Sequence, residues 1–322
     1  EAIVKAVNKC GIYKYITKPW DKGEMKLTID KALEAYELKS DKMKLIRQLE
    51  KANSGLEEKV ELRTKELAEV NKRLMDSIKY AMTIQNAMLM SPETIKEAFT
   101  DFFILFKPLD VVSGDFYWFA DFESEEVNYK FIASVDCTGH GVAGALMSMI
   151  GESLLNQIVY EHEITDAGEI LDNLNIGIQD ILNQSENNNH HGMDASIMII
   201  DENNSELFFA GAQQNLLYSD KGKIKTVKGD RISLGGYLDQ ERNYTTHKLA
   251  YTKGETSFYM FSDGFQDQFG GPDNKKFTVA RLTESIESGL DQSMDKQRDM
   301  LEKVLTEWKG EEKQTDDIMV MG

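Results

Sequence analysis

Residues 135–149, VDCTGHGVAGALMSM, are the stretch on which the choice of fold depends. Its glycines Gly139, Gly141 and Gly144 have the G-x-G-x-x-G spacing of a dinucleotide-binding turn. Asp136 comes directly after the apolar run FIASV, so it would project from the end of a strand into a loop. The two interpretations predict different chemistry, either a glycine cradle for phosphate or a carboxylate site at a strand end.

The sequence context excludes the dinucleotide fold. Such a fold needs a second strand about 20 residues beyond the glycines, ending in an acidic residue that holds the ribose. Residues 161–183, EHEITDAGEILDNLNIGIQDILN, have instead the apolar periodicity of a helix, and we expect no strand before Ala195. The interpretation that gives Asp136 a chemical role therefore fits the sequence better.

The composition limits the location and the partners of the chain. Its 37 Lys and Arg residues against 55 Asp and Glu give a net charge of -18, which argues against nucleic acid and anionic membranes as partners. Cys10 and Cys137 are the two cysteines, and they form neither a disulfide framework nor zinc-type spacing. No apolar run approaches the roughly 18 to 20 residues that span a bilayer, and no signal peptide is recognisable. We expect a cytoplasmic protein.

The first 90 residues predict two parts. Residues 1–37 show a helix at 2–11, a strand at 12–17 and a helix that begins at Asp21, which together form the end of an α/β unit too short to fold alone. Residues 38–90 contain no Pro and one Gly, and their apolar residues recur at spacings of three and four. This heptad pattern predicts a parallel homodimeric coiled coil, the alternative being a solvated single helix. The pattern is formed by Leu45, Leu49, Ala52, Leu56, Val60, Leu67, Leu74 and Ala81.

Residues 91–322 predict a larger α+β domain. Aromatic and β-branched runs such as FFILFK, FYWFADF, ASIMIID and TSFYMFSD indicate strands. Helical periodicity is present at 142–160, 166–184, 276–288 and 293–308. The strands are linked as hairpins and the helices are separate from them. We therefore expect two mostly antiparallel sheets packed face to face with helices outside.

Several aspartates lie at the edges of these apolar strands. They are Asp115 in VVSGDFYW, Asp136 in SVDCTG, Asp263 in FSDGFQ, and the pair Asp316 and Asp317 in TDDIMV. A single Asp at a strand end is most often a turn residue or a helix cap. If these residues meet in one pocket, however, their charges repel at short range, and the cluster needs cations or bound protons.

A cluster of carboxylates predicts a particular kind of metal site. Oxygen ligands without His or Cys side chains favour hard cations, so Mg²⁺ or Mn²⁺ is expected rather than Zn²⁺. Two such ions about 3.5 to 4 Å apart would acidify a shared water and hold phosphoryl oxygens during in-line attack. Such a site needs no protein nucleophile.

At these residues the chain resembles the PPM family (type 2C) of metal-dependent serine/threonine phosphatases, in its bacterial branch of sporulation phosphatases and sigma-factor regulators. The motifs SGDFYW, VDCTGHGVAGALM, FSDGFQDQFG and TDDIMV occur in the order of the family, and the resemblance covers residues 75–322. It implies an α-β-β-α sandwich with two metal ions, Mn²⁺ or Mg²⁺, between the sheets.

The resemblance also implies a role for each matching residue. Asp136 would bridge both ions, and Cys137 would offer its backbone carbonyl. Asp263 and Asp316 would bind one ion, and Asp115 would bind or orient water on the other. Together these five residues are the predicted metal site.

Other positions near the motifs are less determined. His140 lies in the metal loop, where it would either donate a proton to the leaving serine oxygen or orient a carboxylate. By the same resemblance, Asp317 would hold the metal-binding residues in place and would not bind a metal itself. Ser113 stands where family members often carry Gly, and AGAQQNLL lacks a His that is frequent after its Gly. The histidines in SENNNHHG lie in a polar loop, where we expect no metal.

The N-terminal segment YKYITKPWD is similar to the end of a response-regulator receiver domain, in which a Lys before Pro contacts the phosphorylated aspartate. Lys18 and Pro19 match this pattern, and their peptide bond is a candidate for the cis form. We hypothesise that a receiver controls the phosphatase through the dimeric linker. Residues 75–92 would pack on the core and set whether the metal site is assembled.

The resemblance implies a phosphorylated regulatory protein as substrate, for example an anti-sigma-factor antagonist. Two other functions stay open: a catalytically silent dimeric signalling scaffold with the same fold, and a small-molecule phosphohydrolase. The full set of acids argues against the scaffold, because a scaffold has no need to hold mutually repelling carboxylates.

Overall fold

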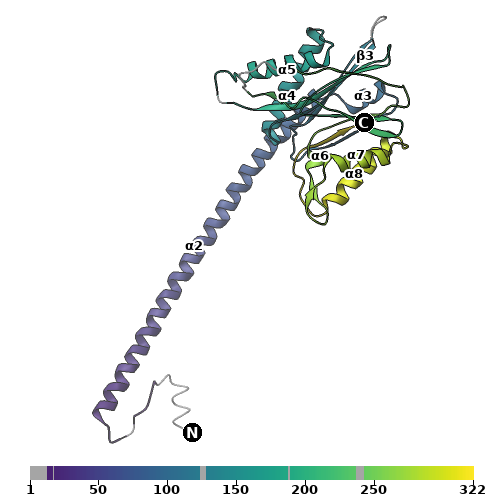
Figure 1. Cartoon of the computed structure of the whole chain (residues 1–322). Coiled ribbons are helices and arrows are strands. Elements are labelled where there is room, and N and C mark those ends of the chain that lie inside the picture. The colour runs from purple at the N-terminus through teal and green to yellow at the C-terminus, as the bar shows by residue number, and fades with distance from the viewer. Residues whose placement is uncertain (1–12, 17, 124–127, 188, 237–242) are drawn as a thin grey trace. The chain divides into compact units, whose positions relative to one another are not determined.

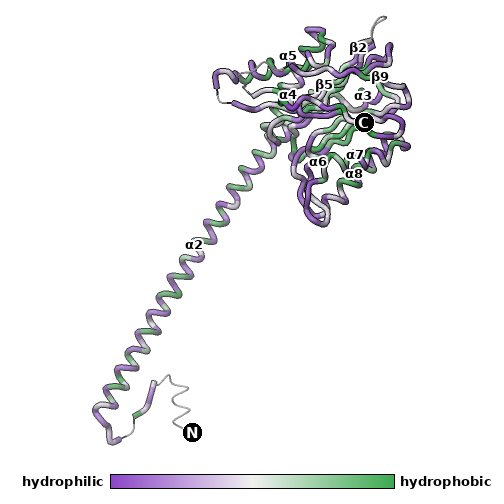
Figure 2. Tube along the Cα trace, viewed as in Figure 1, coloured by the Kyte–Doolittle hydropathy of each residue, from purple (hydrophilic) through white to green (hydrophobic). Residues whose placement is uncertain are grey.

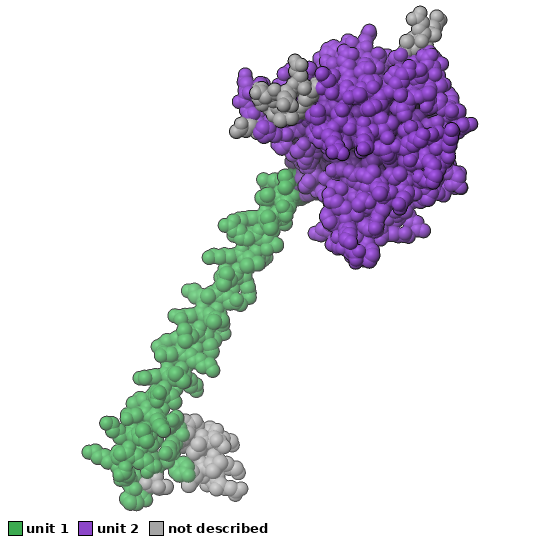
Figure 3. All heavy atoms as spheres, in the orientation of Figure 1, with its two compact units in different colours: residues 1–74 green, residues 75–322 purple. Residues whose placement is uncertain are grey.

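The computed structural model describes residues 13–16, 18–123, 128–187, 189–236 and 243–322 (Figure 1). The chain divides into two compact units, residues 1–74 and residues 75–322, which are described separately below (Figure 3). The three-part division predicted from the sequence, with boundaries after residues 37 and 90, stays a prediction.

Unit 1 consists mainly of the first part of helix α2 (Lys22–Met88). The helix begins where the sequence predicts, because the Asp21 side chain accepts a hydrogen bond from the Glu24 backbone N–H at 2.8 Å. It continues past residue 38 without a break, and its last turns, residues 75–88, belong to unit 2.

The receiver-like segment is only partly described. The helix expected at 2–11 lies outside the described residues. The strand expected at 12–17 is wrong at 13–16, which form no strand. A strand needs a neighbouring strand for its hydrogen bonds, and the described part of unit 1 contains none. The Lys18–Pro19 peptide bond is cis, as the motif suggested.

Helix α2 carries an apolar stripe that unit 1 does not cover. Leu38, Leu49 and Leu67 are 75%, 72% and 61% exposed. Figure 2 shows such hydrophobic positions recurring between hydrophilic ones along the helix. A stripe of this kind normally lies against another surface, which is the basis of the coiled-coil prediction.

The first sheet of unit 2 has the strand order β2-β3-β4-β5-β9, and every neighbouring pair is antiparallel. A short strand, β8, pairs with the start of β4. The strands are β2 (Phe116–Glu123), β3 (Asn128–Cys137), β4 (Gly192–Asp201), β5 (Glu206–Ala212), β8 (Leu234–Gly235) and β9 (His247–Ala250).

The second sheet has the order β1-β13-β10-β6-β7 and is also antiparallel throughout. Its strands are β1 (Ile104–Lys107), β6 (Leu216–Asp220), β7 (Lys223–Val227), β10 (Phe258–Phe261) and β13 (Ile318–Met321). A small ribbon of β11 (Phe269–Gly270) and β12 (Lys275–Lys276) lies apart from both sheets in the pairing.

Helices cover the outer face of each sheet (Figure 1). The first sheet packs against α4 (Gly141–Asn156), its π-helical continuation η1 (Gln157–Glu161), and α5 (Ala167–Ile181). The second packs against α7 (Val279–Ser288) and α8 (Met294–Lys309). Two short helices, α3 (Pro92–Ala98) and α6 (Gly264–Asp267), complete the unit.

A third core lies between the two sheets. Met198 and Phe209 of the first sheet meet Met260 and Met319 of the second, and all four are at most 5% exposed. The unit is therefore an α-β-β-α sandwich, and the predicted fold class and the four predicted helices are confirmed.

One helical stretch of the described chain, Gly141–Glu161, is long and apolar enough to cross a membrane by length and composition. Half of its most apolar window is buried inside unit 2. The core helix of a folded domain has the same character, because one face must match the apolar sheet that it covers.

Candidate metal centre

The predicted acidic residues meet at one end of the sandwich. Asp136 is the next-to-last residue of β3, Asp263 follows β10 and Asp316 precedes β13. These three residues line one cavity of about 280 Å³. Asp115 precedes β2 and is 2% exposed. Because β2 and β3 belong to one sheet and β10 and β13 to the other, both sheets contribute carboxylates to the same pocket.

The glycines of the opening stretch bring the loops of this pocket together. A Cβ on Gly114 would lie 2.5 Å from the Gly139 carbonyl oxygen, and one on Gly144 would lie 2.3 Å from the same atom. Gly139 has a φ of 92°, a backbone conformation that glycine adopts without strain. The G-x-G-x-x-G spacing therefore serves close packing of the loop before β2 against α4, and the dinucleotide interpretation is correctly excluded.

Burial and mutual repulsion strongly perturb the two innermost carboxyls. Burial raises the pKa of Asp136 to about 10, and the charges of Asp115, Asp263 and Asp316 add to the rise. Burial likewise raises the pKa of Asp115 to about 7 despite a hydrogen bond from Ser262. The apoprotein therefore favours protonated acids here, and a bound cation would reverse that preference.

Hydrogen bonds hold these acids in place. The Ser262 hydroxyl donates to Asp115 at 2.5 Å and itself accepts from the Met319 backbone N–H. Asp317 is 2% exposed and accepts from the backbone N–H groups of Leu109 and Gly114, both at 2.7 Å. Asp317 thus ties the start of β13 to the loop that carries Asp115.

His140 also lines the cavity, but it is exposed. Its Nδ1 lies 2.6 Å from the Asp110 carboxylate, and this hydrogen bond raises the pKa of His140 above its usual value. Asp110 was not predicted from the sequence, since nothing in the local sequence points to a partner 30 residues away. The pair is suited to hold a proton next to the carboxylates.

Asp194 is a second residue that the sequence analysis missed. It lies directly opposite Asp136 in the pairing of β3 and β4, and it lines the same cavity. Burial raises its pKa. Gln214 donates a hydrogen bond to the Asp194 backbone carbonyl at 3.1 Å and so fixes this strand. Asp194 stands just before the apolar run ASIMII, and this is the same kind of sequence signal that identified Asp316.

Gln85 is a third such residue. Within α2, all of which is described, Gln85 is the one buried residue. Its side-chain amide donates to the Ser113 carbonyl at 2.7 Å and to the Ser148 hydroxyl of α4 at 2.9 Å, and its oxygen accepts from the Ser113 N–H. The end of α2 is therefore hydrogen-bonded to the backbone of Ser113, two residues before Asp115.

The acidic residues form an open site suited to hard divalent cations, and they do not form a site fully enclosed by protein ligands. In the described part of the chain, no three His, Cys, Asp or Glu side chains form a ready-made metal-binding group. Yet Asp115 and Asp263 are near enough to Asp136 for their charges to raise its pKa. Because Mg²⁺ usually keeps several waters and takes only one or two carboxylates, this open set of acids suits it or Mn²⁺.

Removing one buried charge should stabilise the metal-free protein. A raised pKa means that folding favours the protonated acid, so the free energy of unfolding falls as pH rises above the unfolded value, by about 1.4 kcal/mol per pH unit for each carboxyl. We expect chelated Asp136→Asn to lose less stability than the parent between pH 4 and 8, measured by urea unfolding. Mn²⁺ should stabilise the parent more than the variant. The exposed Asp291→Asn should behave like the parent, and equal pH profiles for all three would contradict the repulsion argument.

Comparison with known proteins agrees with the fold. The profile of the stage II sporulation protein E (SpoIIE) family matches residues 128–322. The SiaA-PP2C domain of Pseudomonas aeruginosa is 32% identical over 79% of this chain and 97% of that chain, with a TM-score of 0.68. No curated protein sequence matches the chain.

Two further solved structures share the fold. They are the PP2C phosphatase domain of SpoIIE from Bacillus subtilis with a fragment of its regulatory domain (15% identity, 69% of this chain, 62% of that chain, TM-score 0.55), and the RsbU and RsbW domains of Rv1364c from Mycobacterium tuberculosis (16% identity, 69% and 58%, TM-score 0.54). The chain therefore belongs to the SpoIIE family of PP2C-type phosphatases, and it is a phosphoprotein phosphatase.

Proposed function

We propose that this chain is a metal-dependent serine/threonine phosphatase that uses two Mn²⁺ or Mg²⁺ ions to hydrolyse phosphoserine or phosphothreonine on a regulatory protein. The observation that carries the proposal is the convergence of Asp115, Asp136, Asp263 and Asp316 from both sheets. Bound ions would supply an acidified water and neutralise the phosphoryl oxygens.

The side chains have distinct tasks in this proposal. Asp136 is affected by the charges of acids from both sheets and would hold both ions, with the Cys137 carbonyl beside it. Asp263 and Asp316 are exposed at the mouth and would hold the ion nearer solvent, while buried Asp115 would hold the other or orient its water. Asp194 is available to orient a further water.

His140 is suited to proton transfer in the same proposal. Its exposed ring lines the cavity, and Asp110 favours the protonated form. A protonated imidazole can give its proton to the serine or threonine oxygen as the phosphorus–oxygen bond breaks. The other role open to His140, orienting a carboxylate, needs the same contact with Asp110.

The partners follow from charge and family. The net charge of -18 does not favour nucleic acid or anionic lipid. Membership of the SpoIIE family supports a phosphorylated regulatory protein as substrate, such as an anti-sigma-factor antagonist, and a cytoplasmic location. The exposed stripe of α2 supports a homodimer formed through this helix.

Control through the N-terminal part is the last element of the proposal. Helix α2 is continuous from Lys22 to Met88 and ends in the Gln85 contacts with Ser113 and Ser148. A receiver that changed the linker dimer could thus alter the loop that carries Asp115. Gln85 is the contact through which such a change would pass.

Activity should require the metal-binding acids. We expect the parent to hydrolyse a phosphoserine peptide with Mn²⁺, and Asp263→Asn to lose at least about 100-fold in kcat, because a metal that stabilises transition-state charge supplies several kcal/mol. Release of phosphate is the measurement. Asp267→Asn, four residues away and outside the cavity lining, is the matched control. Full turnover by Asp263→Asn or in chelator would defeat the proposal, and absence of activity in the parent would favour the scaffold.

Loss of the Gln85 contacts should loosen the metal centre. Gln85→Ala leaves the buried Ser113 N–H and carbonyl without this partner, at a cost of about 1 to 3 kcal/mol. We expect a higher Mn²⁺ concentration for half-maximal activity, with most of the rate recovered at saturating Mn²⁺. The exposed neighbour Asn86→Ala should leave the Mn²⁺ titration unchanged. Identical Mn²⁺ titrations for Gln85→Ala and Asn86→Ala would show that the Gln85 contacts do not affect the metal centre.

The apolar stripe should determine the oligomeric state. We expect the chain to have a dimer mass by light scattering, and Leu45→Asp/Leu49→Asp to have a monomer mass, since paired charges in a coiled-coil seam repel. The matched control is Arg47→Asp/Lys51→Asp, which changes charge off the stripe and should stay dimeric. A monomeric parent would exclude the homodimer.

A further inference from the structure

A second cavity lies at the opposite end of the sandwich from the metal centre. Its volume is about 440 Å³, within the roughly 300 to 1,000 Å³ of small-molecule sites. Its lining includes Ile200 at the end of β4, Phe258 at the start of β10 and Met321 at the end of β13. The metal centre lies at the other ends of these strands, so the two sites are separate.

Aromatic rings form much of this second cavity. Phe99 and Phe102 stack with centroids 5.8 Å apart, and Tyr251 meets Phe258 edge-on at 6.0 Å. The Lys130 ammonium lies 5.3 Å from the Phe99 centroid, so one ring already faces a cation of the protein. Ring faces carry negative charge density and attract organic ammonium groups.

The charges of the lining point to the same class of ligand. It contains three carboxylates, Asp101, Glu202 and Glu255, and one ammonium, Lys253. Glu202 is already paired with Lys130 at 3.0 Å and with Lys253 at 3.5 Å. Glu255 is exposed and has no ion-pair partner among the described residues. An extra positive charge at this mouth is therefore favourable.

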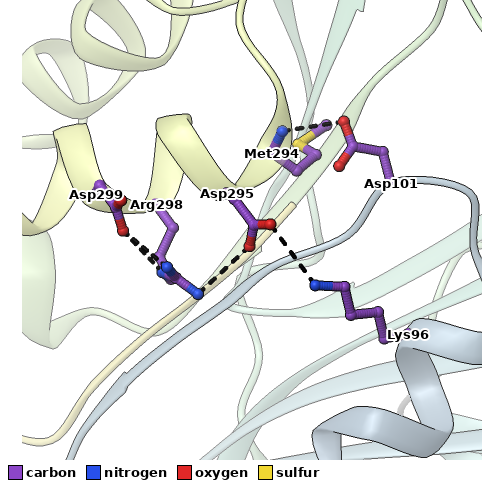
Figure 4. Close-up of polar contacts among 6 residues, drawn as sticks. All are labelled: Lys96, Asp101, Met294, Asp295, Arg298 and Asp299. Carbon is purple, nitrogen blue, oxygen red and sulfur yellow. Dashed lines mark hydrogen bonds and ion pairs between the residues drawn. The ribbon is translucent and has the colours of Figure 1, made fainter.

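Polar contacts hold the segment that carries Phe99 and Phe102 against α8 (Figure 4). The Asp101 carboxylate accepts a hydrogen bond from the Met294 backbone N–H at 3.0 Å, at the start of that helix. Lys96 of α3 lies 3.6 Å from Asp295, which also pairs with Arg298. The cavity is thus largely preformed, which reduces the ordering cost of binding a ligand.

We propose that this cavity binds a small organic amine, with its apolar part among the aromatic rings and Met198 and its ammonium group near Glu255. The inference concerns a site apart from the metal centre and does not depend on the proposed phosphatase mechanism. The aromatic rings and the unpaired carboxylate select an alkylammonium over an anion of the same shape.

Three probes of one shape test the proposal. They are 4-phenylbutylamine, 4-phenylbutan-1-ol and 4-phenylbutanoate, titrated calorimetrically into the full chain in Mn²⁺ buffer. We expect saturable one-to-one binding of the amine, about tenfold tighter than the alcohol, and no saturable binding of the acid. Equal affinities for the three probes, or no saturable binding of the amine, would overturn the proposal.

Variants locate the binding. Met198→Trp should fill the cavity and abolish amine binding, with circular dichroism confirming the fold. The exposed Glu255→Lys should weaken amine binding several-fold, whereas Glu161→Lys, the same charge change at the exposed end of η1, should leave it unchanged. If Met198→Trp does not fold, the comparison of amine binding by Glu255→Lys and Glu161→Lys tests the location of the site. Parent-like binding by Glu255→Lys, or equal loss in both charge variants, contradicts the assignment.

Discussion

Repulsion between aspartates that two different sheets bring together is the constraint on which this structure depends. Asp115 and Asp136 come from the sheet of β2 and β3, whereas Asp263 and Asp316 flank β10 and β13 of the other. Burial raises the pKa of Asp136 to about 10, so the folded apoprotein disfavours its charge. The inter-sheet core must hold these groups together against that cost, which bound divalent cations would offset.

Local signals allowed much of the fold and part of the site to be predicted. Alternating strand patterns were enough to predict the two packed sheets, whereas the meeting of Asp136 with Asp263 was predicted from the resemblance of their motifs to a family. The missed residues act over long range: Gln85 contacts Ser148 across 63 positions, and no local pattern encodes that contact. The strand expected at 12–17 was predicted from its residues alone, but a strand exists only where another can pair with it.

The continuity of α2 gives the Gln85 contact its significance. Its 67 residues contain no Pro, and the helix runs unbroken from Lys22 to Met88. Under the proposed control, a change in the exposed stripe would reach the final turns through this helix. That end carries one buried polar group, whose hydrogen bonds reach both the Asp115 loop and α4.

The physical cost of the acids favours an enzyme over a scaffold. A scaffold with this fold could carry Asn or Ser at position 136, because a neutral side chain there avoids the cost of a buried charge. The chain has instead Asp136 beside Asp115, with Ser262 and Asp317 placed to hold that loop rigidly. In the folded apoprotein burial favours the protonated acids, so their charged forms need neutralisation, which cations in this pocket would supply. The chain therefore gives up stability at the position where a hydrolase needs charge, as expected when a site is built for catalysis.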